Sequence, residues 1–191
     1  MSAHAERLQR ILDHPLVYLH PKRLQIPQRL DTPQSREVLE DIIVQDLGWV
    51  SSTADIALSS VASAWIDAWL RLPEIARLLG VQAAWPHLAR GAAFQHLSAS
   101  ERAFGPCAVS PRLDRFSSEG DSEDVAEQLD TIGLNRLLAF RAIVPAVLIE
   151  RLLLQFSMPV IERQRLLDPA APDAALLTLA IQHVRIHSYP H

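Results

Sequence analysis

Leucine and alanine dominate this sequence of 191 residues, and that bias constrains the fold more than any motif does. Leu contributes 29 residues and Ala 25, whereas the β-branched residues Val, Ile and Thr contribute 12, 13 and 4. Leu and Ala lose little side-chain entropy in a helix, while β-branched residues fit strands better. The 6 glycines are too few for the many tight hairpins of an all-β domain. The composition therefore predicts an all-α fold.

Apolar residues recur at helical spacing along most of the chain, which predicts a single irregular helical domain over residues 1–191 with about seven to nine helices. The segment 104–121 is rich in Gly, Pro and Ser and is the best candidate for a loop. If the domain has two lobes, we expect them to be residues 1–103 and 122–191, joined by this loop. The strongest helical pattern follows residue 121.

Local signals predict where several helices begin and end. Thr32 is the expected N-cap of a helix whose first residue is Pro33. Pro73 is expected to begin a short helix that Gly80 ends, with a separate helix around 83–90. Pro145 should kink or break the long apolar pattern. Gly48 is expected to end the helix that begins at Pro33. Ser52 and Asp55 have the spacing of a capping box at the start of the next helix.

Charge and cysteine content exclude several classes of protein. The 18 basic and 22 acidic residues give a formal net charge of −4, which disfavours nucleic-acid binding through bulk electrostatics. The single cysteine, Cys107, excludes an intrachain disulfide framework and a multi-thiolate zinc site. The longest apolar run, 142–149, is far shorter than a membrane span of about 20 residues. We expect a cytoplasmic protein without a signal peptide or direct membrane insertion.

The sequence lacks the common catalytic motifs, namely a P-loop, a GxGxxG turn, a GxSxG elbow and an HExxH pair. His183 and His187, spaced i and i+4, could bind one metal with His191 as a third ligand. The simpler interpretation is a polar helix face near the end of the chain. Likewise, Trp65 and Trp69 are expected in the core rather than on an exposed binding stripe. We therefore predict a protein that is not an enzyme and has no cofactor, metal or catalytic residue.

An acidic segment without any cation between Phe116 and Asn135 is the candidate partner surface. Acidic groups at a helix start complement the helix dipole, and this accounts for Asp121, Glu123 and Asp124 without a partner. The later residues, Glu127 and Asp130, could meet a basic surface of another protein. The residues of the acidic segment are Glu119, Asp121, Glu123, Asp124, Glu127 and Asp130.

The order of segments resembles the SctK family (the YscK/PscK group) of bacterial type III secretion systems. The resemblance rests on PLVYLHP over 15–21, on WLRLPEIARLLG from Trp69, and on GLNRLLAFRAIVPAVLIERLLLQFSMP from Gly133. It implies a mostly helical, non-catalytic accessory component of the cytoplasmic sorting platform, associated with virulence. Such a component would link the inner-membrane ring protein (SctD) to the SctQ pod and would be peripheral to the inner membrane.

Two alternatives use different chemistry. A type III secretion chaperone or regulatory protein-binding module would grip an unfolded client, and a strand-rich core would favour it. A small helical metal-dependent enzyme would use His183 and His187 with a distant carboxylate, and stoichiometric metal in the purified protein would favour it.

Overall fold

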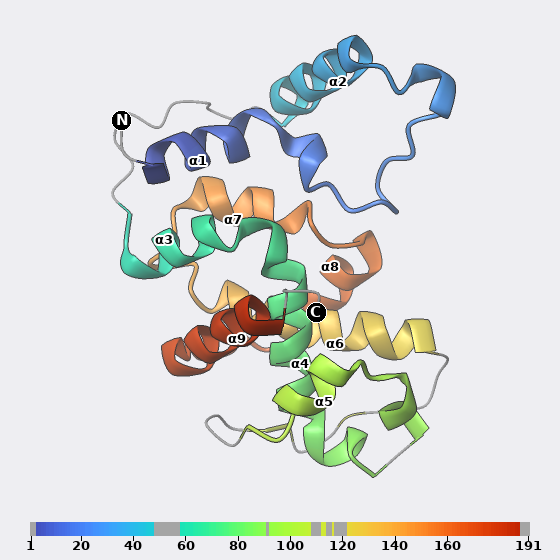
Figure 1. Cartoon of the computed structure of the whole chain (residues 1–191), viewed down its shortest axis with the longest axis vertical. Coiled ribbons are helices and arrows are strands. Elements are labelled where there is room, and N and C mark those ends of the chain that lie inside the picture. Colours follow the sequence, from blue (N-terminus) through green and yellow to red (C-terminus); the bar gives the residue numbers. More distant parts are fainter. Residues whose placement is uncertain are drawn as a thin grey trace. The chain divides into compact units, whose positions relative to one another are not determined.

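The computed structural model describes residues 3–47, 58–90, 92–107, 112–113, 116 and 122–187. Within these ranges the chain forms nine α-helices and four short 3-10 helices, without a strand (Figure 1). The all-α prediction is confirmed. The α-helices are α1 (Ala3–Asp13), α2 (Pro33–Asp46), α3 (Ser60–Asp67), α4 (Leu72–Leu88), α5 (Ala99–Phe104), α6 (Ser122–Leu138), α7 (Ala146–Leu153), α8 (Met158–Gln164) and α9 (Ala174–His187). The 3-10 helices are η1 (Pro15–Val17), η2 (Gln28–Leu30), η3 (Trp69–Arg71) and η4 (Ala92–His96).

The helices group into two compact units, each built from two separate stretches of the chain. Unit 1 contains Met1–Leu70 and Arg141–Met158, and unit 2 contains Arg71–Phe140 and Pro159–His191. The chain thus passes between the units three times, and none of these passages falls in the segment 104–121. The single domain with possible lobes at 1–103 and 122–191 stays a prediction, and the two units follow a different division.

In unit 1, the helix boundaries predicted at Thr32 and Pro145 are confirmed. Thr32 caps α2, where its hydroxyl accepts a hydrogen bond from the Ser35 backbone at 3.2 Å. The helix before Pro145, α6, already ends at Leu138, and Pro145 is the N-cap of the next helix, α7. Because proline lacks an amide donor and restricts the preceding residue, a new helix begins there rather than a kinked continuation. Gly48, Ser52 and Asp55 lie outside the described residues.

The core of unit 1 contains large apolar side chains from α1, α3 and α7. Trp65 is completely buried, and Trp69 is 4% exposed and meets the Tyr18 ring edge-on with centroids 5.4 Å apart. The prediction that both indoles belong to the core is confirmed. The Tyr18 hydroxyl donates to the Ile11 carbonyl at 2.8 Å, so the buried ring keeps a partner for its polar end.

Unit 2 is organised around a close crossing of α4 and α6. A Cβ atom added to Gly80 would lie 2.0 Å from the Leu129 carbonyl oxygen, and one added to Gly133 would lie 1.8 Å from that of Ala76. Each glycine therefore lets the other helix's backbone approach. The prediction that Gly80 ends a short helix is wrong, because α4 continues through it to Leu88.

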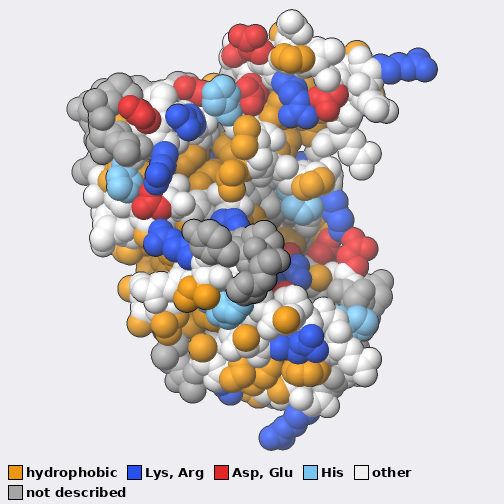
Figure 2. All heavy atoms as spheres, viewed as in Figure 1, with side chains coloured by type: hydrophobic (Ala, Val, Ile, Leu, Met, Phe, Trp, Pro, Cys, Tyr) orange, Lys and Arg blue, Asp and Glu red, His pale blue; other side chains and the backbone are white. Residues whose placement is uncertain are grey.

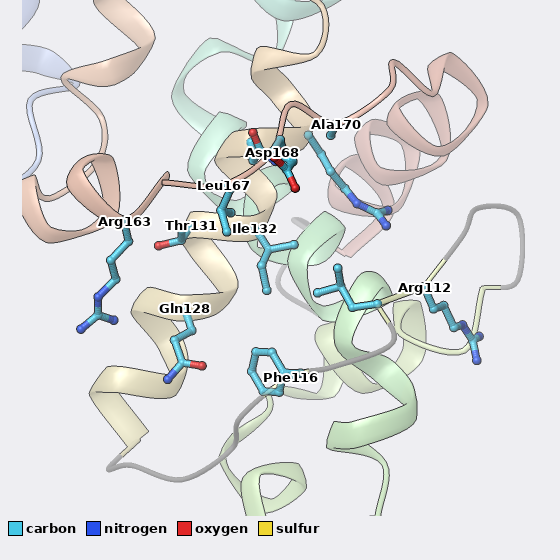
Figure 3. Close-up of a pocket in the computed structure, with 12 residues that line it drawn as sticks. Arg112, Phe116, Gln128, Thr131, Ile132, Arg163, Leu167, Asp168 and Ala170 are labelled. Carbon is cyan, nitrogen blue, oxygen red and sulfur yellow. The ribbon is translucent and has the colours of Figure 1, made fainter. Parts of the chain in front are cut away.

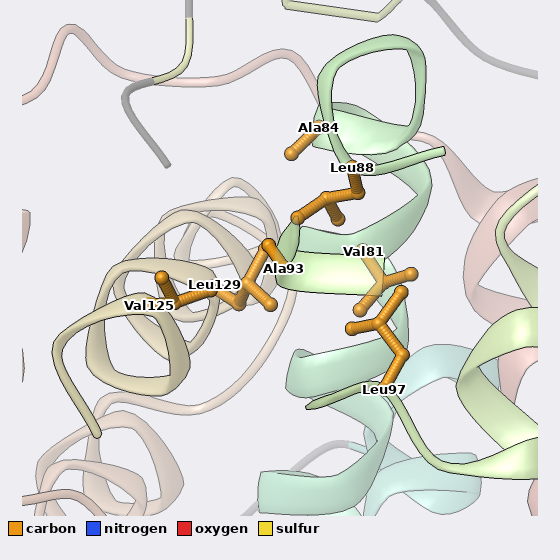
Figure 4. Close-up of a cluster of buried hydrophobic side chains, with 7 residues drawn as sticks. All are labelled: Val81, Ala84, Leu88, Ala93, Leu97, Val125 and Leu129. Atoms are coloured by element: carbon orange, nitrogen blue, oxygen red, sulfur yellow. The ribbon is translucent and has the colours of Figure 1, made fainter. Parts of the chain in front are cut away.

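The hydrophobic cluster beside this crossing includes residues from α4, α6, η4 and the turn after η4. Figure 4 shows side chains of α4 and α6 pointing toward one another across the gap between the two helices. A capping box in which Ser98 and Glu101 bond each other's backbone then begins α5. The cluster consists of Val81, Ala84, Leu88, Ala93, Leu97, Val125 and Leu129.

Candidate protein-interaction surfaces

The acidic segment predicted as a partner surface lies mainly on α6. Four of its residues are in the described part of the chain and two are outside it: Glu123, Asp124, Glu127 and Asp130 are described, and Glu119 and Asp121 are not. The four described residues extend over the first half of α6. They belong to unit 2, where cations from distant parts of the sequence meet the carboxylates of Asp124, Glu127 and Asp130.

Asp130 forms a two-pronged ion pair with Arg77 of α4. The Arg77 Nε and Nη2 atoms donate to the two Asp130 oxygens at 2.6 and 2.7 Å. Burial alone would lower the pKa of Arg77, yet the hydrogen bonds and charge of Asp130 raise it. Glu101 of α5 adds a second carboxylate 3.7 Å from the same guanidinium. Asp130 is therefore part of the contact between α6 and α4.

Asp124 pairs with Arg163 of α8. The Arg163 Nη1 atom lies 2.8 Å from Asp124 Oδ1 and 3.9 Å from Glu127 Oε2. A hydrogen bond from Gln128 lowers the pKa of Asp124, and Arg163 lowers it further. Arg77 and Arg163, which pair with these carboxylates, come from helices far away along the chain. The sequence around the acidic segment therefore gives no sign of them. That the acidic segment binds a partner stays a prediction.

Beside α6 lies a second feature, a pocket of about 600 Å³, which we name the α6 pocket. It is formed within unit 2 by α6, by the chain from Arg163 to Ala170, and by residues 112, 113 and 116. In Figure 3, Ile132 and Phe116 point into its centre, while Arg112 and Arg163 lie on opposite sides. The lining consists of Arg112, Leu113, Phe116, Gln128, Thr131, Ile132, Asn135, Arg136, Arg163, Leu167, Asp168 and Ala170.

Unit 1 has an apolar groove of its own, of about 450 Å³, between residues 24–30 and α2, which we name the α2 groove. In the sequence, α2 has the spacing of an amphipathic helix, but no side chain on it is buried. Val38 and Ile42 are 57% and 52% exposed. The groove is lined by Leu24, Gln25, Ile26, Pro27, Leu30, Gln34, Ser35, Val38 and Leu39.

The two helical histidines contribute to packing within unit 2. The rings of His183 and His187 stack with centroids 4.0 Å apart, and His183 Nε2 lies 3.0 Å from the Ser100 hydroxyl oxygen. Burial and then the nearby His187 lower the pKa of His183. His191 lies outside the described residues, and those described contain no group of three or more potential metal ligands. His183 therefore joins α9 to α5 through its contact with Ser100.

The face of the molecule drawn in Figure 2 carries charges of both signs. On the face shown in Figure 2, acidic and basic side chains are interspersed with apolar ones, and no broad field of one sign covers it. Nucleic-acid binding relies on a dense field of cations, which this face lacks. None of the described helices is both long enough and apolar enough to cross a bilayer.

Comparison with known proteins matches most of this chain to one family. The family described as "Bacterial type III secretion apparatus protein (OrgA_MxiK)" matches residues 8–186. The chain belongs to the OrgA_MxiK family. It is also 30% identical, over 190 residues, to the oxygen-regulated invasion protein OrgA of three Salmonella typhimurium strains, 14028s, SL1344 and LT2. Each alignment covers 96% of this chain and 88% of the relative.

Membership of the OrgA_MxiK family confirms the SctK resemblance, since OrgA and MxiK proteins are SctK proteins. The chain is therefore a component of a bacterial type III secretion apparatus. No solved structure matches the chain. Sequence reasoning reached the family, but it missed the arginines of the α6 pocket and the exposure of α2. The helical spacing of Val38 and Ile42 marked α2 as amphipathic, yet spacing does not show whether another element covers the apolar side.

Proposed function

We propose that this OrgA_MxiK protein is a non-enzymatic adaptor of the sorting platform, which links the cytoplasmic domain of an SctD-like ring protein to an SctQ-like pod protein. In this proposal the protein is held at the cytoplasmic side of the inner membrane by the ring. Its chemistry is that of surface recognition, in which a few apolar or Arg anchors contribute most of the binding free energy.

One observation carries the proposal: each compact unit has its own partly exposed apolar depression. An adaptor must hold two partners at once, so it needs two surfaces that do not compete. The α2 groove belongs to unit 1 and the α6 pocket belongs to unit 2. Exposed apolar surface of this kind is typical of sites that another protein covers.

The test uses one substitution in each surface. Val38→Asp places a charge in the α2 groove, and Leu167→Asp places one in the α6 pocket. Two matched controls put the same change at equally exposed positions outside them. Val17 is 65% exposed against 57% for Val38, and Leu179 is 37% exposed against 41% for Leu167.

Binding of the full chain to the pod protein and to the ring protein's cytoplasmic domain is then measured by pull-down and calorimetry. We expect each surface variant to lose one partner by roughly tenfold or more in Kd and to keep the other. Both control variants should bind both partners as the parent chain does. A parent chain that binds neither partner would contradict the adaptor proposal.

A further inference from the structure

The apolar part of the α6 pocket is left partly open to solvent. Leu113 and Leu167 are 36% and 41% exposed, and Ile132 and Phe116 are half-buried. Phe116 also packs against the hydrophobic cluster of unit 2, so the floor of the pocket is continuous with the core. Such a floor favours a large apolar side chain that would complete its packing.

The charged part of the pocket is predominantly basic. Three guanidinium groups line it, those of Arg112, Arg136 and Arg163, against one carboxylate, that of Asp168. Arg163 is paired with Asp124, as described above. Arg112 donates to the Pro106 backbone carbonyl at 2.9 Å, and no carboxylate among the described residues pairs with it.

Arg136 adds a positive charge that is half removed from water. Its Nη1 atom donates to Gln82 Oε1 at 2.8 Å. Burial lowers the pKa of Arg136, with Asp173 acting in the opposite direction. A carboxylate that entered the pocket would offset this desolvation and would therefore be favoured over a neutral or basic group.

We infer that the α6 pocket binds a short segment of a partner protein in which a bulky apolar side chain is flanked by carboxylates. The apolar side chain lies against Ile132, Phe116 and Leu167, and the carboxylates face Arg112 and Arg136. A pocket of about 600 Å³ accommodates a few side chains, which fits a segment rather than a whole domain. This inference rests on the proposed function, because it names the chemistry of one of the two partners.

The experiment uses overlapping synthetic peptides that cover the pod protein and the ring protein's cytoplasmic domain of the same secretion system. Binding of each peptide to the full chain is measured by fluorescence polarisation. We expect the peptides that bind to share an apolar residue flanked by Asp or Glu. Replacing those acidic residues by Lys should weaken binding by roughly tenfold or more.

Variants of the chain then locate the binding site. Leu167→Asp should abolish peptide binding, and Arg112→Glu should weaken it several-fold and reduce its dependence on salt. The controls Leu179→Asp and Arg185→Glu, both on α9 of the same unit, should leave it unchanged. Circular dichroism of each variant confirms that the helices are retained.

The two proposals fail in different ways. If intact partners bind the parent chain but no peptide does, or if Leu167→Asp binds peptides normally, the pocket inference is wrong and the adaptor proposal stands. Binding of basic peptides alone, or of acidic peptides that lack an apolar residue, also overturns the inference. If acidic peptides bind in the pocket but the intact partners do not bind, the adaptor proposal fails instead.

Discussion

The crossing of α4 and α6 gives a prediction whose sign depends on packing. Gly133 lies in the interior of α6, where replacing glycine by alanine in an isolated helix adds about 1 kcal/mol of stability. In the folded protein, the added Cβ would lie 1.8 Å from the Ala76 carbonyl oxygen. We expect Gly133→Ala to destabilise the protein despite its better helix propensity.

The magnitude follows from how far the helices would have to separate. An ordinary contact of this kind begins at 3.4 Å, so the added atom is about 1.6 Å too close. The obstacle is backbone, which cannot change rotamer, and the movement would loosen the packing of the hydrophobic cluster to which Val81 and Leu129 belong. Overpacking of this kind costs about 3 kcal/mol, at the upper end of the usual range. After the gain in propensity, the net loss is about 2 kcal/mol.

Thermal and urea unfolding of the full chain, followed by circular dichroism, measure this effect. A loss of about 2 kcal/mol lowers Tm by roughly 4–8 °C in a protein of this size. Ala175→Gly, at an exposed position in the first turn of α9, measures a helix-propensity effect separately in the same unit, with an expected cost below the roughly 1 kcal/mol of a helix interior. If Gly133→Ala is as stable as the parent chain, or more stable, the reasoning from the close crossing is wrong.

Two further predictions concern charges in unit 2. A double-mutant cycle with Arg77→Met and Asp130→Asn should give a coupling free energy of about 1–3 kcal/mol, because this ion pair is two-pronged and mostly shielded from solvent. The control pair, Arg71 and Glu74, has side chains that are over 40% exposed and should couple by less than about 0.5 kcal/mol. Equal couplings in the two cycles would show that shielding has no effect. Burial lowers the pKa of His183 in the folded state below its ordinary value of 6.5. The stability that neutral His183 contributes to the fold is therefore fully present above pH 6.5, and it is lost as the pH falls through 6.5 toward the folded-state pKa. His183→Gln should remove that part of the pH dependence, and an unchanged profile between pH 7 and 5 would contradict the assignment.

Features that depend on neighbouring residues could be predicted from the sequence. Thr32 caps α2 and Pro145 lies at a break between helices, as expected. In each case the signal and the structure it specifies lie within a few residues of one another. The chemistry of a hydroxyl acceptor or of a missing amide donor is then enough to place a boundary.

Gly80 shows why other features could not be predicted. A glycine after an apolar run is a common helix stop, and nothing near Gly80 in the sequence distinguishes that role from a close helix crossing. The deciding contact is the Leu129 carbonyl oxygen, about fifty residues away along the chain. A long-range approach of this kind has no local signal, so the sequence predicts two helices where the structure has one, α4.

For the candidate surfaces too, the sequence shows the local residues but not the distant ones that they meet. The charges of Asp124 and Asp130 were visible in the sequence, but their partners Arg163 and Arg77 lie on helices distant in sequence, and only the fold brings them together. The α6 pocket joins residues 112, 113 and 116 with residues between 163 and 170 on either side of α6. The amphipathic spacing of α2 was equally visible, while the exposure of Val38 depends on the absence of a covering element within the described residues.

The central claim is that this protein joins two partners that do not otherwise associate. Light scattering after size-exclusion chromatography tests it directly on a mixture of the pod protein and the ring protein's cytoplasmic domain, with and without this chain. We predict a complex that contains all three proteins when the chain is present and separate partners when it is absent. Partners that associate equally well without the chain, or that displace each other from it, would contradict the account.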